Sequence, residues 1–140
     1  MQRIWAPLLV AVGLVGTSAQ AQVPAQTLST HGVRITVPDG WRRAGLLSDC
    51  SDPSQVLALV RRNEAVILIL ERRNGHFPAR STFRLTPRPT RFEGCCGQPT
   101  GPGYRFAFRD RGRNFYAFVY APDRANAARA AAVLNTLRVS

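Results

Sequence analysis

The chain has 140 residues, of which 19 are basic and 8 acidic, and its formal net charge is +11. This length is typical of one ordinary domain, and the sequence contains no internal repeat and no sign of a second domain. Every basic residue is Arg and none is Lys, and Ala, Gly and Pro are abundant. Such a composition indicates GC-rich codon usage, so Arg enrichment alone does not establish a recognition surface.

Residues 1–21 have the pattern of a secretory signal peptide. Arg3 precedes a short apolar run, residues 8–15, and the small-residue pattern Ala19-Gln20-Ala21 follows. We expect cleavage after Ala21. The apolar run is short for a bilayer span, although an uncleaved anchor is the alternative, and no second membrane segment follows. The sequence thus predicts a secreted or periplasmic protein without a transmembrane segment after cleavage.

The first strand of the folded domain is expected within residues 32–41. The polar stretch before it, residues 22–31, is predicted to be a flexible lead-in. Val33, Ile35 and Val37 alternate with polar residues, which is typical of a strand with one buried face. A Pro-Asp-Gly turn ends this strand, and the tryptophan that follows is expected to fold back onto the sheet.

A first hairpin is predicted over residues 55–72. Two near-continuous apolar runs rich in Val, Ile and Leu meet at Asn63-Glu64, which indicates two well-buried strands. The preceding loop, residues 42–53, has room for a short strand at its start. The hairpin is followed by a loop, a short edge strand at residues 83–85, and an irregular segment at residues 93–103 that holds four glycines.

Residues 104–120 predict the central hairpin. Tyr104, Phe106 and Phe108 alternate with other residues along the first strand. The return strand is apolar or aromatic at every position from residue 115 to residue 120, so both of its faces are expected to be covered. About four aromatic side chains are expected to share one face of this hairpin.

Two loops fit this hairpin. A two-residue loop at Arg111-Gly112 places Phe115 opposite Phe108, whereas a loop that also includes Asp110 shifts the return strand by one residue and exchanges its faces. We favour the three-residue loop. Arg is unfavourable at the positive φ that a type I′ turn needs at its first position, whereas Gly112 suits the last position.

A C-terminal helix is predicted over residues 124–137. Asp123 is a suitable N-cap, and the segment is rich in Ala with apolar residues at helical spacing. The predicted fold class is therefore α+β: one domain, residues 32–140, with a single antiparallel sheet of about five or six strands and this helix on one face.

The two ends of this domain resemble a known group. A strand ending in Val-Pro-Asp-Gly-Trp, residues 37–41, and a closing Leu-Asn-Thr-Leu-Arg segment, residues 134–138, are similar to the PsbP/Mog1-like small α+β domains. The chain also looks like small exported proteins of unknown function from high-GC bacteria. The resemblance implies an accessory or binding module, and it transfers no catalytic residue.

The three cysteines predict a disulfide in an exported protein. A bridge of Cys50 with Cys95 or Cys96 is favoured over a strained vicinal bridge between Cys95 and Cys96. It would close a loop of about 45 residues and stabilise the fold by roughly 3–4 kcal/mol. The third thiol would then be free or intermolecular, which allows a covalent dimer.

The sequence gives little support for a catalytic site or a metal site. Cys50, Cys95, Cys96 and His76 could be assembled around a metal, but adjacent cysteines fit a tetrahedral shell poorly and structural zinc usually has C-x₂₋₄-C spacing. No nucleophile signature surrounds a Cys paired with His31 or His76. The eight carboxylates form no paired hydrolase pattern. We predict no catalytic residue, no metal and no cofactor.

The positive charge is the global feature with functional content. It gathers on the central hairpin at Arg105, Arg109, Arg111 and Arg113. With the aromatic residues of the same strands, this cluster resembles an anion-binding surface, while the alternative is a solvated face without a ligand. Outside the cell, an anionic envelope component or an acidic protein is a better-matched partner than nucleic acid.

These observations favour an exported, non-catalytic binding or accessory protein of the cell envelope. The alternative is a thiol/disulfide redox protein or enzyme that uses the Cys95-Cys96 loop.

Overall fold

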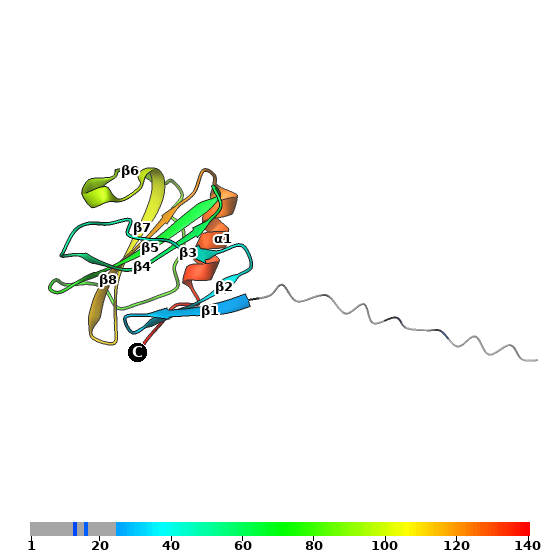
Figure 1. Ribbon diagram of the computed structural model, residues 1–140, viewed down its shortest axis with the longest axis horizontal. Coiled ribbons are helices and arrows are strands. Elements are labelled where there is room, and N and C mark those ends of the chain that lie inside the picture. The colour runs from blue at the N-terminus through cyan, green and yellow to red at the C-terminus, as the bar shows by residue number, and fades with distance from the viewer. Residues whose placement is uncertain (1–12, 14–15, 17–24) are drawn as a thin grey trace, which may run out of the picture.

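The computed structural model describes residues 13, 16 and 25–140 (Figure 1). The signal peptide predicted for residues 1–21 falls almost wholly outside the described residues and stays a prediction. Within residues 25–140 the chain forms two antiparallel sheets and one α-helix. The larger sheet has six strands in the order β3-β4-β5-β8-β7-β6, and the smaller has three in the order β1-β2-β9.

The strands of the larger sheet are β3 (Arg42–Arg43), β4 (Ser54–Arg61), β5 (Ala65–Arg72), β6 (Thr90–Glu93), β7 (Thr100–Asp110) and β8 (Arg113–Tyr120). Those of the smaller sheet are β1 (Ala25–Thr30), β2 (Val33–Pro38) and β9 (Arg138–Val139). The mixed α+β character is confirmed, whereas the prediction of a single sheet is wrong. The strand at residues 33–38 belongs to the smaller sheet, because its partners are β1 and β9 and not the hairpins.

The expected flexible lead-in at residues 22–31 is corrected from Ala25 onward. Residues 25–30 form β1, which pairs with β2 along its whole length, from Ala25 opposite Pro38 to Thr30 opposite Val33. Most of its side chains are exposed, so an edge strand here needs almost no apolar residues. Backbone pairing without a buried face leaves no period-two pattern in the sequence.

Both predicted hairpins are confirmed in position. β4 and β5 are joined by a tight turn in which the Glu64 amide donates to the Arg61 carbonyl at 2.9 Å. The short strand allowed after Trp41 exists as β3, which pairs with β4. β8 lies between β5 and β7, and both of its faces are covered, as its uninterrupted apolar sequence predicts.

The preferred three-residue loop of the central hairpin is wrong. Asp110 pairs with Arg113 and Phe108 with Phe115, so Arg111 and Gly112 form a two-residue loop with φ of 51° and 76°. Left-handed backbone at a non-glycine residue costs about 1–2 kcal/mol. A one-residue slip would turn Tyr116, Phe118 and Tyr120 toward the main core in place of Phe115, Ala117 and Val119. Overpacking of this kind costs about 1–3 kcal/mol at each site. Core packing therefore outweighs the strain at Arg111.

Two further local predictions are corrected. Residues 83–85 are not a strand, because the side chain of Asn135 takes the place of a neighbouring strand at Phe83. Its Oδ1 accepts from the Phe83 amide at 2.8 Å and its Nδ2 donates to the Phe83 carbonyl at 3.1 Å. Residues 93–103 are only partly irregular, because β6 ends at Glu93, one turn of 3₁₀ helix (η1, Cys95–Gly97) follows, and β7 begins at Thr100.

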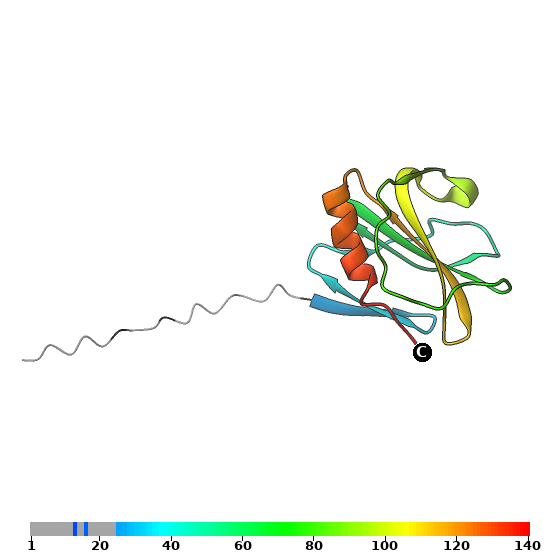
Figure 2. The ribbon, with the colours of Figure 1, turned by 180° about the vertical axis from the view of Figure 1, so that it is seen from behind.

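The C-terminal helix, α1 (Arg124–Leu134), begins where predicted and ends three residues early. The Asp123 carboxylate accepts from the Asn126 amide at 2.8 Å, which caps the helix. After Leu134 the chain tightens into two single turns and then enters β9. The helix packs on β5 and β8 of the larger sheet and on β2 of the smaller one, as the rear view shows (Figure 2).

The central strands of the larger sheet are therefore covered on both faces. Its inner face packs against α1 and β2 in the main core. Its outer face carries a second apolar cluster, consisting of Ala58, Leu68, Leu70, Phe118 and Tyr120. Ala44 and Leu47 pack on that cluster from residues 44–53, the segment between β3 and β4 that we call the cover loop. The structure thus supplies the second covering layer that the sequence of β8 requires.

Candidate functional site

The outer face of the larger sheet collects guanidinium groups around one tyrosine. Strand alternation places Arg105 and Arg109 of β7 on this face, together with Tyr116 of β8 and Arg72 of β5. The cross-strand register makes one lateral row of Arg72, Asn114 and Arg109. The two flanking arginines of this row lie two strands apart, about 10 Å, and Arg105 lies about 13 Å along β7 from Arg109.

Tyr116 is the centre of this group. The Arg105 guanidinium lies 5.5 Å from the centroid of the tyrosine ring, within cation–π range. Arg72 Nη1 approaches the Tyr116 hydroxyl at 3.5 Å, and the ring of Phe77 packs 4.8 Å away. Half-buried Tyr116 therefore offers a flat apolar surface bordered by positive charge.

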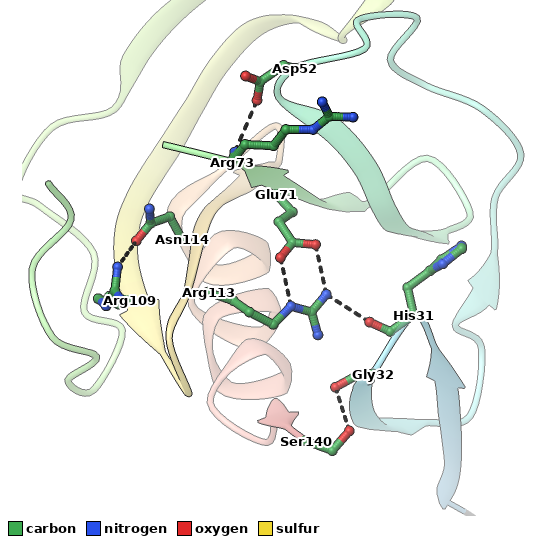
Figure 3. Close-up of polar contacts among 9 residues, drawn as sticks. All are labelled: His31, Gly32, Asp52, Glu71, Arg73, Arg109, Arg113, Asn114 and Ser140. Atoms are coloured by element: carbon green, nitrogen blue, oxygen red, sulfur yellow. Dashed lines mark hydrogen bonds and ion pairs between the residues drawn. The ribbon is translucent and has the colours of Figure 1, made fainter. Parts of the chain in front are cut away.

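Arg113 does not belong to this surface, which corrects the predicted four-arginine cluster. Its side chain lies on the inner side of β8, where Nε and Nη2 donate to the two carboxylate oxygens of Glu71 at 2.7 and 2.8 Å (Figure 3). Nη2 also donates to the His31 carbonyl at 2.8 Å. Figure 3 shows Arg109 and Asn114 well away from this pair. A bidentate ion pair of this kind leaves Arg113 committed to the fold.

The Glu71–Arg113 pair joins the two sheets through the hydrogen bond from Arg113 to the His31 carbonyl. Glu71 is on β5, Arg113 on β8, and His31 lies in the turn between β1 and β2. The turn must approach closely, because a Cβ on Gly32 would lie 2.7 Å from Arg113 Nη1. The hydrogen bond from Arg113 lowers the pKa of Glu71, against the opposing effect of partial burial, and Glu71 in turn raises the pKa of Arg113.

The two remaining predicted arginines differ in their constraints. Arg109 Nη1 donates to Asn114 Oδ1 at 3.2 Å, and the Asn114 amide donates to the Gly75 carbonyl, so Arg109 is held near the sheet. Arg111 lies exposed in the turn. Arg72 of β5, which is not among the four arginines predicted from the sequence, completes the surface. The alternation of β5, in which Leu68 and Leu70 precede Arg72 on one face, is the signal that identifies it.

The cysteines are brought together beside the same face. Cys50 of the cover loop is bridged to Cys96 of η1, with 5.4 Å between their Cα atoms, and Cys95 is free and exposed. This resolves the choice between Cys95 and Cys96. The Asp49 amide also donates to the Cys96 carbonyl at 2.8 Å, so the cover loop is held at η1 by a covalent and a polar contact.

A metal-binding role does not fit the bridged form. Asp49, Cys50 and Cys96 lie close enough to share an ion, with potential ligand atoms within 4.8 Å of one another. Both sulfurs are consumed by the bridge, however, and a thiolate is what a metal binds. His76, which the sequence offered as a fourth ligand, is exposed and outside this group.

The surroundings of Tyr120 show that the outer cluster is apolar. Its side chain is buried beside Phe92 and Phe118, and burial raises the pKa of its hydroxyl to about 12. Among the described residues, its hydroxyl and that of Ser48 are buried without a hydrogen-bond partner. The cluster is therefore a packed apolar layer, and Tyr116 and Phe92, which pack against it, stay half-buried.

No family model, no curated protein and no solved structure matches this chain. The resemblance to PsbP/Mog1-like domains accordingly stays a prediction. In the part of the chain that the structure describes, no helix has the length and apolar character needed to cross a membrane.

The Glu71–Arg113 pair predicts an acid dependence of stability. Because the pKa of Glu71 is lowered in the folded protein, its contribution is present above the ordinary carboxyl pKa and is lost as pH falls through the folded value. From about pH 5 to pH 3, the free energy of unfolding of Glu71→Gln should fall less steeply than that of the wild type. Urea titrations at several pH values measure this. Glu93→Gln, at an exposed position of β6 that forms no ion pair within the described part of the chain, serves as control, and an equal slope in wild type and Glu71→Gln would contradict the role of the pair.

The bridge predicts a large stability difference between two cysteine variants. The bridged residues are 46 apart in sequence, so Cys50→Ser should lower the free energy of unfolding by about 4 kcal/mol through lost loop closure. Cys95→Ser keeps the bridge and should unfold almost like the wild type. Chemical denaturation, with non-reducing peptide mapping of protein isolated and alkylated in acid, tests both points, and an unpaired Cys50 in such a wild-type sample would refute the assignment.

Proposed function

We propose that this protein is an exported, non-catalytic binding module of the cell envelope, and that it recognises an anionic partner on the outer face of β5, β7 and β8. The observation that carries the proposal is the arrangement of Arg72, Arg105 and Arg109 around Tyr116. The same rows of the sheet contain asparagine and apolar residues and no carboxylate.

The chemistry of this surface suits phosphate or carboxylate groups spaced along a polymer or a lipid surface. Guanidinium groups bind such anions through paired N–H donors. The backbone spacing of the three arginines, about 10 Å across the strands and about 13 Å along β7, allows several anionic groups to be engaged at once. Tyr116 adds an apolar platform beside the charges. Removal of Arg3 with the signal peptide leaves 18 basic and 8 acidic residues, and the resulting net charge of +10 draws an anionic partner toward the protein, at a rate that falls with ionic strength.

Export supports this choice of partner. A signal peptide over residues 1–21 directs the chain out of the cytoplasm, where anionic envelope components and acidic proteins are available and nucleic acid is not an expected ligand. A disulfide between Cys50 and Cys96 is typical of an oxidising compartment.

A second candidate function is thiol/disulfide redox chemistry at the Cys95-Cys96 loop. The observation that favours it is the exposed Cys95 thiol, whose sulfur lies 3.5 Å from the bridged sulfur of Cys96. The two candidate functions differ in their requirement for Cys95: redox chemistry needs its thiol, whereas anion binding does not.

Export predicts the mature N-terminus. Cleavage after Ala21 should leave Gln22 as the first residue of the protein recovered from the medium or the periplasm. N-terminal sequencing measures this directly. Recovery of the protein from membranes with Met1 intact would contradict both the cleavage and the localisation.

Charge reversal tests the anion surface. Arg105→Glu with Arg109→Glu should weaken binding to phosphatidylglycerol-containing vesicles by about thirtyfold or more, since each arginine near an anionic surface contributes about 1 kcal/mol. Binding of the wild type should fall steeply as salt rises, because the interaction is screened. Vesicle co-sedimentation at several salt concentrations measures both effects, and the melting temperature reports whether the variant is folded.

The matched control changes the same charge elsewhere. Arg34 of β2 and Arg84 are exposed and lie away from the outer face, so Arg34→Glu with Arg84→Glu alters the net charge equally. This pair should weaken binding much less. Equal losses in the two double variants would show that the attraction is generic charge and not a site.

A further inference from the structure

Three cysteines meet at one point on the edge of the outer face. Cys50 comes from the cover loop and Cys96 from η1, and these two are bridged. Cys95 is exposed and free, and its Sγ lies 3.5 Å from Cys96 Sγ. A thiol is therefore positioned next to a disulfide sulfur within the same chain, in a sulfur–sulfur contact that brings a nucleophile to its target.

The backbone of η1 creates this contact. In extended chain, consecutive side chains point in opposite directions, but Gly94, Cys96 and Gly97 adopt left-handed backbone with φ of 77°, 58° and 76°. Cys96 is a non-glycine residue in this region, which costs about 1–2 kcal/mol. Gly94 cannot be replaced without movement, because a Cβ there would lie 2.6 Å from the Gln98 carbonyl oxygen and from Thr100 Cγ2. A strained turn thus holds two adjacent sulfurs on one side.

We propose that Cys50, Cys95 and Cys96 form an internal thiol–disulfide exchange site in which Cys95 attacks Cys96. The Cys95 thiolate forms a new bond to Cys96 Sγ while the bond between Cys96 and Cys50 breaks. Cys50 leaves as a thiolate and takes up the proton that Cys95 lost. One disulfide and one thiol are present before and after, so the step needs no oxidant, reductant or partner.

The exchange changes what holds the cover loop. In the product, η1 contains a vicinal bridge and Cys50 is a free thiol on the loop. Because a vicinal bridge is strained, this product is the minor form at equilibrium. The loop keeps its other anchor, since Gln55 Oε1 accepts from the Leu47 and Ser48 amides at 2.7 and 3.1 Å and Gln55 Nε2 donates to the Gly45 carbonyl at 3.0 Å. The covalent link between the loop and η1 is thereby removed while the loop stays attached to β4.

Asp49 slows the exchange. Its carboxylate lies within 4.8 Å of the sulfurs of Cys50 and Cys96, and it is exposed. Its negative charge opposes the approach of the Cys95 thiolate and the charge that develops on Cys50 as it leaves. Removing this charge should accelerate the step, which gives the proposal a readout independent of stability.

The test measures over time which of the three cysteines carries the free thiol. The full-length mature protein is isolated at pH 4, where thiol exchange is slow, and is moved to pH 8.5 without added thiol or oxidant. Samples are quenched in acid, alkylated and mapped as non-reduced peptides. We expect the label to lie on Cys95 at first and then to appear on Cys50, at a rate that does not depend on protein concentration. Label confined to Cys95 at all times would overturn the proposal.

The variants sharpen this outcome. Asp49→Asn should raise the initial rate about three- to fivefold at low salt, whereas the remote Asp39→Asn should not change it. Cys95→Ser should give no label at Cys50. Label that appears on Cys96 would mean that Cys50 is the sulfur attacked, and a rate proportional to protein concentration would mean exchange between molecules; either result would overturn the assigned step.

Discussion

The fold depends on one constraint: β5 and β8 are apolar on both faces, and the chain has one helix within its described part to cover them. That helix and β2 bury the inner face. The outer face would expose Leu68, Leu70, Phe118 and Tyr120 unless another segment lay over it. The cover loop fills this role without regular structure, and the bridge from Cys50 to Cys96, with the side chain of Gln55, holds it in place. Burial of a sheet by a loop requires such fixed points, because a loop has no hydrogen-bonded ladder of its own.

The same constraint shapes the surface that remains. Tyr116 packs on the outer cluster and stays half-buried, with Arg105 and Arg72 beside it. On the inner side, Arg113 is occupied by Glu71 and by the turn between β1 and β2, so its charge serves to join the two sheets. Arg105, Arg109 and Arg113 lie close together on one hairpin. They nevertheless divide between surface and structural roles, according to the face of the sheet on which each side chain lies. The exchange site proposed for Cys95 acts on the loop that defines the boundary of this surface.

Several features could be predicted from the residues because they are local. Period-two alternation identified β2 and β7, uninterrupted apolar runs identified β4, β5 and β8, and Asp123 marked the start of α1. The features that escaped prediction depend on partners distant in sequence. β1 has almost no buried face and exists through its pairing with β2, and the backbone of Phe83 is satisfied by Asn135 of the C-terminal segment and not by a strand. Neither arrangement produces a period-two alternation of apolar and polar residues in the segment concerned.

The sequence alone predicted the mixed α+β character, the two hairpins at residues 55–72 and 104–120 and the central position of β8, and it favoured a bridge from Cys50 to one of two adjacent cysteines. These properties follow from hydrophobic period, turn chemistry and cysteine number. Only the tertiary structure decided the division into two sheets, the two-residue loop at Arg111-Gly112, the pairing with Cys96, and the separation of Arg113 from Arg105 and Arg109. In each case the deciding contact comes from a segment distant in sequence, through strand pairing, side-chain burial or the Glu71–Arg113 ion pair, and the local residues do not specify it.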